Sequence, residues 1–466
     1  MLTSKSETHA VVMGASMGGL LAARVLSNHF GQVTLVERDP VHDQPESRKG
    51  QPQTRHLHGL LASGLDILTR YYPDLPEALT ARGALVTDMT EHMQWYAFGG
   101  YRKRFSMGVR AALMSRPLLE YLIRQRTLAL PNVTLLDNTA VKGLAITTDR
   151  QRVTGVQVER RNDDADVHTL AADLVVDATG RGSRTPQWLA EMGYVAPDES
   201  EVKVNVGYAS RVYRRNPADP LANDWILVTP DAPRETRFGG MFPIEGNRWI
   251  VSLGGWMGDH APIDEPGFLE YARSLPAPDI YETIRDAEPL SDIIPHKFVS
   301  SLRRHYEKLA RFPEGLLVMG DAISSFNPTY GQGMTSAAMQ AIELDQLLAE
   351  SDISQPGLAA AFFKRAARVV DIPWQLAVGE DFRFPGTTGP KPAGIDLINR
   401  YVAAVHRATQ DDIVVGAAFI NVMNLTAAPT SLMTPGMMLR VWRANRRLNQ
   451  QPSKQNRLTS SSTVPA

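Results

Sequence analysis

Three small residues near the start of the chain have the types and spacing needed to bind a phosphate group. Gly14, Ser16 and Gly19 follow a short apolar stretch in the G-x-G-x-x-G spacing of dinucleotide-binding turns, with serine at the second glycine position. Glycine at the first position permits a tight turn, and the helix that follows offers unpaired N–H groups and a positive dipole end. We therefore predict a pyrophosphate site at Gly14, Ser16, Met17, Gly18 and Gly19.

An acidic residue lies at the distance from this turn that a ribose contact requires. Glu37 comes 23 residues after Gly14, at the end of a strand predicted over 33–37, where a carboxylate accepts hydrogen bonds from adenosine ribose hydroxyls. Arg38 beside it leaves two alternatives open, because a guanidinium could meet a 2′-phosphate or stack on adenine. The strand, turn, helix and acid together favour a dinucleotide over a turn without a ligand.

The segment GDAISSFNPTYGQGM, residues 320–334, combines an acid with glycines at a helix start. Asp321 follows a strand predicted over 316–319, where its carboxylate suits the hydroxyls of an extended chain such as ribitol. Gly331 and Gly333 expose N–H groups at the start of an Ala-rich helix, aimed where a reduced flavin becomes anionic at N1 and C2=O. A single FAD that stretches between the two glycine segments would satisfy both.

These residues must be positioned by parallel strands and by a second sheet. The stretch 172–189 is a further apolar strand without a ribose-binding acid, so we expect it to complete the FAD-binding sheet. Four stretches between the flavin motifs predict an antiparallel sheet of about four to six strands: 93–107, 205–215, 225–230 and 236–255. Half of the residues on a strand face away from any pocket. With that limit, the substrate-lining candidates are His58, Trp95, Met241 and Phe242.

Composition restricts the classes of function. The 466 residues include 49 Lys and Arg against 50 Asp and Glu, so the chain has no overall basic field for nucleic acid or an anionic membrane. The absence of cysteine excludes disulfides and thiolate ligands. The longest apolar run, 413–423, is too short to span a membrane, and the polar start 1–9 lacks the plan of a signal peptide. We expect a cytoplasmic protein with small-molecule partners and no metal site, because His56 and His58 have no evident carboxylate partner.

The motifs taken in order resemble those of one flavoprotein superfamily. Gly14-x-Ser16-x-x-Gly19 with Glu37, Asp177-Ala-Thr-Gly180, and Gly320-Asp321 followed by Pro328 and Gly331-x-Gly333 are similar to the FAD-dependent aromatic hydroxylases typified by para-hydroxybenzoate hydroxylase. The resemblance covers most of residues 9–350. The stretch RKGQPQTRHLHGLL, residues 48–61, is further similar to the group that contains the polyether-ionophore epoxidases. The resemblance implies additional cofactor contacts at Arg48, Lys49, Arg116, Val141, Pro328 and Met334.

The resemblance also implies a reaction. In a single-component monooxygenase, NADPH or NADH reduces FAD, O₂ adds at flavin C4a, and the hydroperoxide epoxidises or hydroxylates a substrate, here an apolar polyketide- or terpenoid-like molecule. The flavin carries this chemistry, so no catalytic side chain is assigned. The alternatives are a flavin-dependent reductase of isoprenoid double bonds and a non-catalytic binding protein on the same fold. A halogenase is disfavoured because the Trp-x-Trp-x-Ile-Pro segment of those enzymes is absent.

The expected fold is α/β: a Rossmann-type FAD-binding domain with an inserted antiparallel β-sheet substrate domain and a helical C-terminal region. The FAD-binding domain is expected in three parts, 1–92, 108–190 and 285–350. The substrate domain comprises a hairpin at 93–107 and a sheet at 191–284. Residues 351–448 are predicted to be helical, with a Pro/Gly loop at 382–394 that folds over the pocket and a solvated basic face at 440–447. The tail 449–466 is expected to be disordered.

Overall fold

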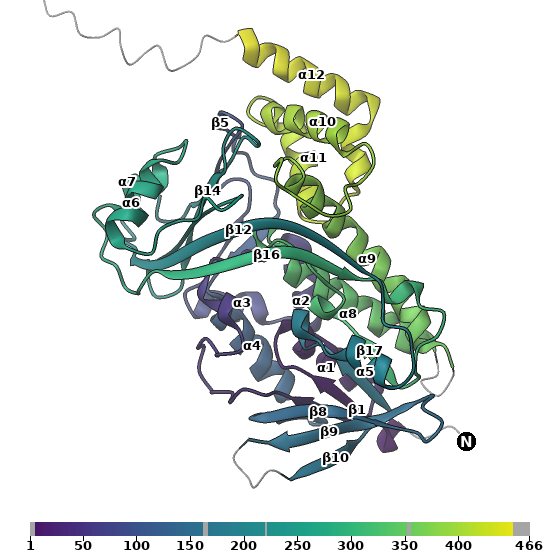
Figure 1. Ribbon diagram of the computed structural model, residues 1–466. Helices are drawn as coiled ribbons and strands as arrows, with labels where there is room; N and C mark the ends of the chain where they lie inside the picture. Colours follow the sequence, from purple (N-terminus) through teal and green to yellow (C-terminus); the bar gives the residue numbers. More distant parts are fainter. Residues whose placement is uncertain (1–4, 162–165, 220, 352–355, 451–466) are drawn as a thin grey trace, which may run out of the picture.

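The computed structural model describes residues 5–161, 166–219, 221–351 and 356–450 (Figure 1). A five-stranded parallel sheet has the order β17-β11-β1-β2-β7. Its strands are β1 His9–Met13, β2 Gln32–Val36, β7 Val133–Leu136, β11 Leu174–Asp177 and β17 Leu316–Val318. Helix α1, Met17–His29, connects β1 to β2, which confirms the predicted βαβ unit. Strand β11 lies between β1 and β17, so the chain returns to this sheet after two long excursions.

Both faces of the parallel sheet are buried, as the continuous apolar runs of its strands require. On one face, Ala10 and Val12 pack with α1, with α4 (Arg116–Leu128) and with α8 (Gly333–Glu350). On the other face, Val11 and Met13 pack toward a three-stranded antiparallel sheet. Its strands are β8 Thr139–Ile146, β9 Val153–Arg160 and β10 Val167–Ala171. The carboxyl ends of β1, β2 and β17 therefore meet at one edge, where ligands bind in sheets of this kind.

A second sheet has eight strands in the order β18-β16-β12-β15-β14-β13-β4-β5. The strands are β4 Met93–Ala97, β5 Gly100–Tyr101, β12 Glu199–Arg214, β13 Trp225–Thr229, β14 Arg237–Ile244, β15 Arg248–Gly255, β16 Ile294–Arg304 and β18 Ser324–Ser325. Strand β13 pairs with β4 in parallel, and the other pairs are antiparallel. The sheet is larger than the four to six strands expected, chiefly because β16 pairs with β12. We propose that the third part of the FAD-binding domain begins after Arg304 rather than at residue 285.

The two faces of the eight-stranded sheet pack against different layers. On one face, Met241, Trp249 and Val251 pack with α6 (Glu265–Arg273) and α7 (Asp279–Ile284). On the other face, Trp95, Trp225 and Phe242 belong to a core shared with the C-terminal helices. Those helices are α9 Leu358–Asp381, α10 Ile395–Ala408, α11 Ile413–Met423 and α12 Pro435–Gln450, which confirms the predicted helical region. In Figure 1, α10, α11 and α12 form the end of the molecule opposite β8, β9 and β10.

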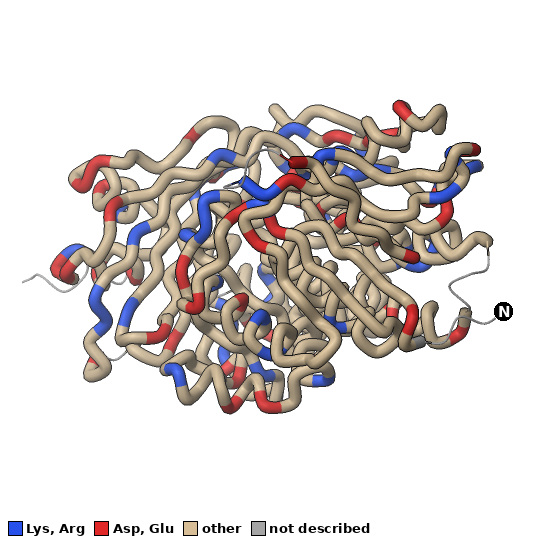
Figure 2. Tube along the Cα trace, turned by 90° about the horizontal axis from the view of Figure 1, so that it is seen from below, with Lys and Arg blue, Asp and Glu red and all other residues tan. Residues whose placement is uncertain are grey.

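Shorter elements connect these layers: α2 Ala62–Tyr71, α3 Leu75–Ala81, α5 Thr185–Glu191, β3 Leu85–Asp88 and β6 Arg110–Leu113. Of the tail predicted to be disordered, residues 449 and 450 end α12, and 451–466 lie outside the described residues. Within the described residues, no helix is long and apolar enough to cross a membrane, and no three His, Asp or Glu side chains are grouped to hold a metal. Acidic and basic residues are interspersed along the trace in Figure 2.

Candidate functional site

A cavity of about 1080 Å³ extends from the glycine turn after β1 to the C-terminal helices. Its lining residues come from both ends of the chain, from Met13 to Met433. Thirteen of the residues predicted to bind the cofactor line this one cavity: Gly14, Ser16, Met17, Gly18, Glu37, Arg38, Arg116, Val141, Asp321, Pro328, Gly331, Gly333 and Met334. The fold thus brings together the two glycine segments that are separated by about three hundred residues in the sequence.

The turn after β1 requires glycine at two positions. Gly14 has a φ of +95°, and a Cβ there would lie 2.8 Å from the carbonyl oxygen of Ala178. A Cβ on Gly19 would lie 1.7 Å from the carbonyl oxygen of Gly14, so the helix can start this close to the strand only without a side chain. Gly19 does not line the cavity. We assign its role to the packing of α1 on β1, and not to a contact with a phosphate.

The carboxylate of Glu37 is held in place at the end of β2 by backbone donors. Its oxygens accept hydrogen bonds from the N–H of Ala15 at 2.9 Å and the N–H of Asp39 at 3.1 Å, and Arg48 Nη1 lies 3.2 Å from Oε2. The N–H of Thr139, at the start of β8, donates to the Glu37 carbonyl at 2.8 Å. This contact places the first residues of β8, Thr139 to Val141, beside Glu37, and all of them line the same part of the cavity.

Arg48 and Lys49 do not line the cavity. Lys49 is exposed. Arg48 is buried behind the turn, where its Nη2 donates to Glu120 Oε1 at 2.6 Å and to the carbonyl of Ala15 at 2.9 Å. That Arg48 lies near the pyrophosphate of a bound cofactor stays a prediction; among the described residues its guanidinium contacts the turn at Ala15 and the carboxylate of Glu37.

Glu120 is a member of this site that the sequence reasoning missed. It lies one helical turn after Arg116 on α4, accepts a hydrogen bond from the Ser16 hydroxyl at 3.1 Å, and lies 3.5 Å from Arg116 Nη2. Burial raises the pKa of Glu120, but Arg116 and Arg48 lower it further, so its pKa lies below the usual range. The signal available in the sequence was an acid on the buried face of an apolar helix, four residues after a predicted ligand.

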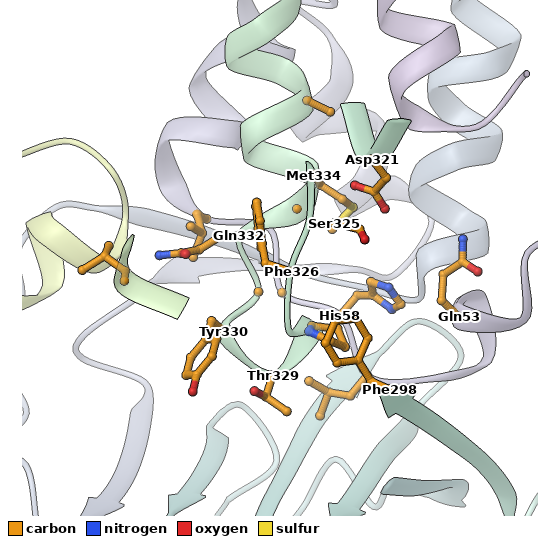
Figure 3. A pocket seen from close by; sticks show the side chains of 18 of the residues that line it. Gln53, His58, Phe298, Asp321, Ser325, Phe326, Thr329, Tyr330, Gln332 and Met334 are labelled. Atoms are coloured by element: carbon orange, nitrogen blue, oxygen red, sulfur yellow. The ribbon is translucent and has the colours of Figure 1, made fainter. Parts of the chain in front are cut away.

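Asp321 and the loop that follows form the other half of the cofactor site. Asp321 lies three residues after the end of β17 and directly after Gly320, and its carboxylate faces the cavity near Met334 (Figure 3). Burial raises the pKa of this carboxyl, and the nearby Arg116 and Arg181 oppose the shift. Gly331 has a φ of +69°, which places the start of α8 at Gly333 against the cavity.

FAD fits the groups that line this part of the cavity. The side chain of Gln332 is buried, lines the cavity, and has no partner for either amide atom among the described residues. Arg116 Nε is likewise buried without a partner there. Unmade hydrogen bonds of buried polar groups are costly, so these atoms are suited to the phosphate, ribitol and ring oxygens of a bound dinucleotide.

The loop 323–332, called the ring loop here because it leads to the predicted ring contacts, is held by a buried acid that the sequence did not reveal. Asp381, at the end of α9, accepts hydrogen bonds at Oδ1 from Asn327 Nδ2 (2.9 Å), Tyr330 OH (2.8 Å) and Trp256 Nε1 (3.3 Å). Its Oδ2 has no partner among the described residues. Burial, opposed by these three donors, raises the pKa of Asp381 to about 7. Phe384, in the predicted loop 382–394, stacks on Trp256 and lines the cavity.

A small polar group lies between the ring loop and the eight-stranded sheet. His58 lines the cavity, and burial together with Arg116 lowers its pKa to about 4. Tyr208 and His296 also line it, with ring centroids 5.1 Å apart, and burial lowers the pKa of His296 and raises that of Tyr208. His56 donates to or accepts from Ser210 Oγ at 2.8 Å and does not line the cavity. All three cavity residues are therefore neutral at pH 7.

Beyond the ring loop the cavity becomes a mostly apolar chamber. Trp95 and Phe242 line this chamber, as the sequence predicted. Met241 is instead fully buried on the opposite face of the eight-stranded sheet, against α6 and α7. Adjacent residues on a strand point to opposite faces, so the expectation for Met241 was wrong once Phe242 faced the chamber. The opposite wall comes from the C-terminal helices, which carry no motif: Leu376, Tyr401, Val402, Phe419, Ile420 and Met423.

Comparisons with known proteins agree with this geometry. The chain matches the family model described as "FAD binding domain" over residues 7–353. It is 33% identical over 414 residues to "Protein Rv3254" of Mycobacterium tuberculosis (strain ATCC 25618 / H37Rv), which covers 85% of this chain and 86% of the relative. It is 24% identical over 398 residues to the kynurenine 3-monooxygenase of Xanthomonas campestris pv. campestris (strain 8004), which covers 79% of this chain and 77% of that protein.

A solved structure has the same architecture. The flavin-dependent brominase Bmp2 superposes with a TM-score of 0.66 at 13% sequence identity, and the match covers 96% of this chain and 100% of that one. At this level of identity the likeness shows the fold alone. The reaction of this chain must therefore be argued from the residues of its own site.

Proposed function

The chain belongs to the FAD-binding domain family, and from this premise we propose that it is a single-component monooxygenase that uses NADPH or NADH and O₂ to epoxidise or hydroxylate an apolar small molecule. The supporting observation is one cavity that joins the phosphate turn, Asp321 and the start of α8 to an aromatic chamber. The bound flavin would supply the redox chemistry, from hydride acceptance to O₂ activation. The protein would bind it, orient the substrate and exclude water.

The cofactor contacts divide into two groups. The turn at Gly14 and Ser16 would receive the pyrophosphate, and Glu37 the adenosine ribose, with Val141 offering backbone atoms toward adenine. Asp321 would accept hydrogen bonds from ribitol hydroxyls. The N–H groups at Gly333 would stabilise negative charge on the reduced ring, because they lie at the positive end of α8.

The chamber would protect the oxygen-transfer step from water and hold the substrate. Its walls include Trp95, Trp225 and Phe419, and water exclusion would strengthen the electrostatic contacts of the polar groups that also line it. Tyr208 and His296 are two neutral polar groups whose ring centroids lie 5.1 Å apart there. They would position a substrate hydroxyl, and a neutral His296 can accept the proton of a phenol.

This arrangement favours an apolar substrate of the polyketide or terpenoid kind. An alkene would need only the apolar walls, since epoxidation requires no base, whereas hydroxylation of a phenol would use His296. A reductase of isoprenoid double bonds remains the second candidate, because an apolar chamber beside a flavin also suits that reaction. A binding protein without turnover is the candidate outside enzymology.

One experiment separates these candidates. Purified protein is supplied with FAD, NADPH or NADH, and a panel of apolar alkenes and phenols, while O₂ uptake, cofactor oxidation and product mass are recorded. We expect O₂ uptake coupled to a product that has gained one oxygen atom. A product that has gained two hydrogen atoms without O₂ uptake would indicate the reductase instead. Protein that stays colourless after addition of FAD would contradict the proposal and favour the binding protein.

A further inference from the structure

The C-terminal helices present an apolar face that no described part of the chain covers. Trp442 is 57% exposed and Leu397 is 72% exposed, although tryptophan and leucine are mostly buried in soluble domains. Ile398, Met433, Met438 and Leu439 are also exposed. We call these six residues on α10, α12 and the turn before α12 the helical end face. The end of the molecule that carries them is the top of Figure 1.

The six residues form one surface because α10 and α12 are packed in parallel register. Asn445 Nδ2 of α12 donates to the carbonyl of Ala404, and Arg407 of α10 donates to Asn449. The same offset places Leu397 and Ile398 at the start of α10 beside Met438 and Leu439 at the start of α12. Val441 and Ala444 form the buried stripe of α12. Met438, Leu439 and Trp442 therefore point away from that packing.

The net charge around the helical end face is positive. Residues 391–450 contain three acidic residues, and each forms an ion pair: Asp396 with Lys391, Asp411 with Arg447, and Asp412 with Arg440. Arg400, Arg443 and Arg446 make no ion pair among the described residues. The sequence alone, with its balanced total charge, gave no sign of this local excess. A basic face next to exposed tryptophan and leucine is the composition of a helix that lies on an anionic bilayer.

The helical end face is continuous with the apolar chamber. Ile398 and Met433 line the far end of the cavity and belong to the face as well. We propose that this face docks on an anionic lipid surface, with Trp442 and Leu439 at the level of the acyl chains and Arg443 and Arg446 at the headgroups. An apolar substrate would then pass from the bilayer into the chamber between Ile398 and Met433. The entry of substrate from the bilayer rests on the proposed function, whereas lipid binding does not.

Vesicle binding tests the proposal directly. The full chain with bound FAD is mixed with vesicles of phosphatidylglycerol and phosphatidylcholine or of phosphatidylcholine alone, and the bound fraction is measured by sedimentation. We expect binding to the anionic vesicles that weakens with salt, and at least about a tenfold loss in the double variants Leu439→Ser/Trp442→Ser and Arg443→Glu/Arg446→Glu. The matched control is Val195→Ser/Ile263→Ser, which removes two apolar residues that are more exposed than Leu439 and Trp442 but lie outside the face, and this variant should bind as the parent does.

Three results would overturn the proposal. One is no binding to anionic vesicles by the parent, and another is equal loss in the control variant. The third is a dimer, detected by light scattering without lipid, that the Leu439→Ser/Trp442→Ser variant abolishes, because a second copy of the chain would then cover the face. Flavin absorbance of each variant shows that the fold is retained. A monooxygenase assay that fails while vesicle binding follows the expected pattern would reject the proposed function and leave the lipid surface standing.

Discussion

The two ends of the cavity are built in different ways. At the phosphate end, charge and backbone dominate: Glu37, Arg48, Glu120 and Arg116 form a chain of alternating charges around the turn at Gly14. At the chamber end, contacts are mostly apolar and come from two distant layers, the eight-stranded sheet and the C-terminal helices. The first end is fixed by a few specific contacts. The second is fixed by the shape of many side chains.

This difference has a consequence for function. Losing one member of the charged chain leaves its partner buried without compensation, so the cofactor end should tolerate little change. An apolar wall can be altered at one position while its total volume is kept, so the chamber can be refitted to other substrates. The family would then keep the cofactor end and vary the chamber, which is how one fold carries several reactions.

The largest expected effect comes from Glu120→Ala. The change leaves the guanidiniums of Arg48 and Arg116 buried without their shared carboxylate, which should lower the free energy of unfolding by about 3–5 kcal/mol. Bound FAD should be lost with it, because Ser16 and the turn lose their support. Urea unfolding and the flavin absorbance of the purified protein measure both. Glu350→Ala, which removes an exposed partner of Arg365, is the control and should leave the unfolding midpoint nearly unchanged.

The next effect should fall on cofactor binding alone. Asp321→Ala removes the proposed ribitol contact and should weaken FAD binding by about 1.5–3 kcal/mol, the usual range for a hydrogen bond to a charged group. The loss of yellow colour on dialysis gives the measurement. Asp292, an exposed acid outside the cavity, supplies the control variant Asp292→Ala. An Asp321→Ala protein that stays fully yellow would refute the ribitol assignment.

Sequence was sufficient for the cofactor end where the determinants are local. Gly14, Glu37 and Asp321 each follow a strand at a fixed spacing, so their positions follow from the order of the elements. Glu120 was missed because its partners come from the turn and from Arg48, more than seventy residues earlier. Whether Met241 faces the chamber depends on which face of its sheet packs against α7. An alternating pattern of residues shows that neighbours point to opposite faces, but not which face meets α7. The wall formed by Phe419 and Met423 has no motif, since any apolar helix of the right shape would serve.

A change in the chamber should separate the two ends. Met423→Trp fills part of the cavity opposite the sheet and should lower kcat/KM for a large apolar substrate about tenfold or more, as misfit in an apolar pocket typically does. Flavin content should stay at the parent level. Ile263→Trp adds the same ring at an exposed position outside the cavity and is the matched control. Loss of FAD in the Met423→Trp protein would show that the chamber and the cofactor end are not independent.

The last prediction concerns Asp381, the buried acid that accepts hydrogen bonds from Asn327 and Tyr330. Because burial raises the pKa of Asp381 from its ordinary value near 4 to about 7, the folded protein holds a proton that the unfolded chain has released. The contribution of this group to stability is therefore greatest at about pH 4 and is lost as pH rises toward about 7, with a slope of at most about 1.4 kcal/mol per pH unit.

The variant Asp381→Asn cannot ionise at this position, so the difference in unfolding free energy between parent and variant should shrink or reverse over that range. The neutral His56 and His58 are present in both proteins and cancel from the difference. The free energy of unfolding of parent and variant is measured in urea between about pH 5 and about pH 8. If the two plots of free energy against pH are parallel, Asp381 is already ionised in the folded protein, and the ring loop is held by a charged carboxylate rather than by a protonated carboxyl group.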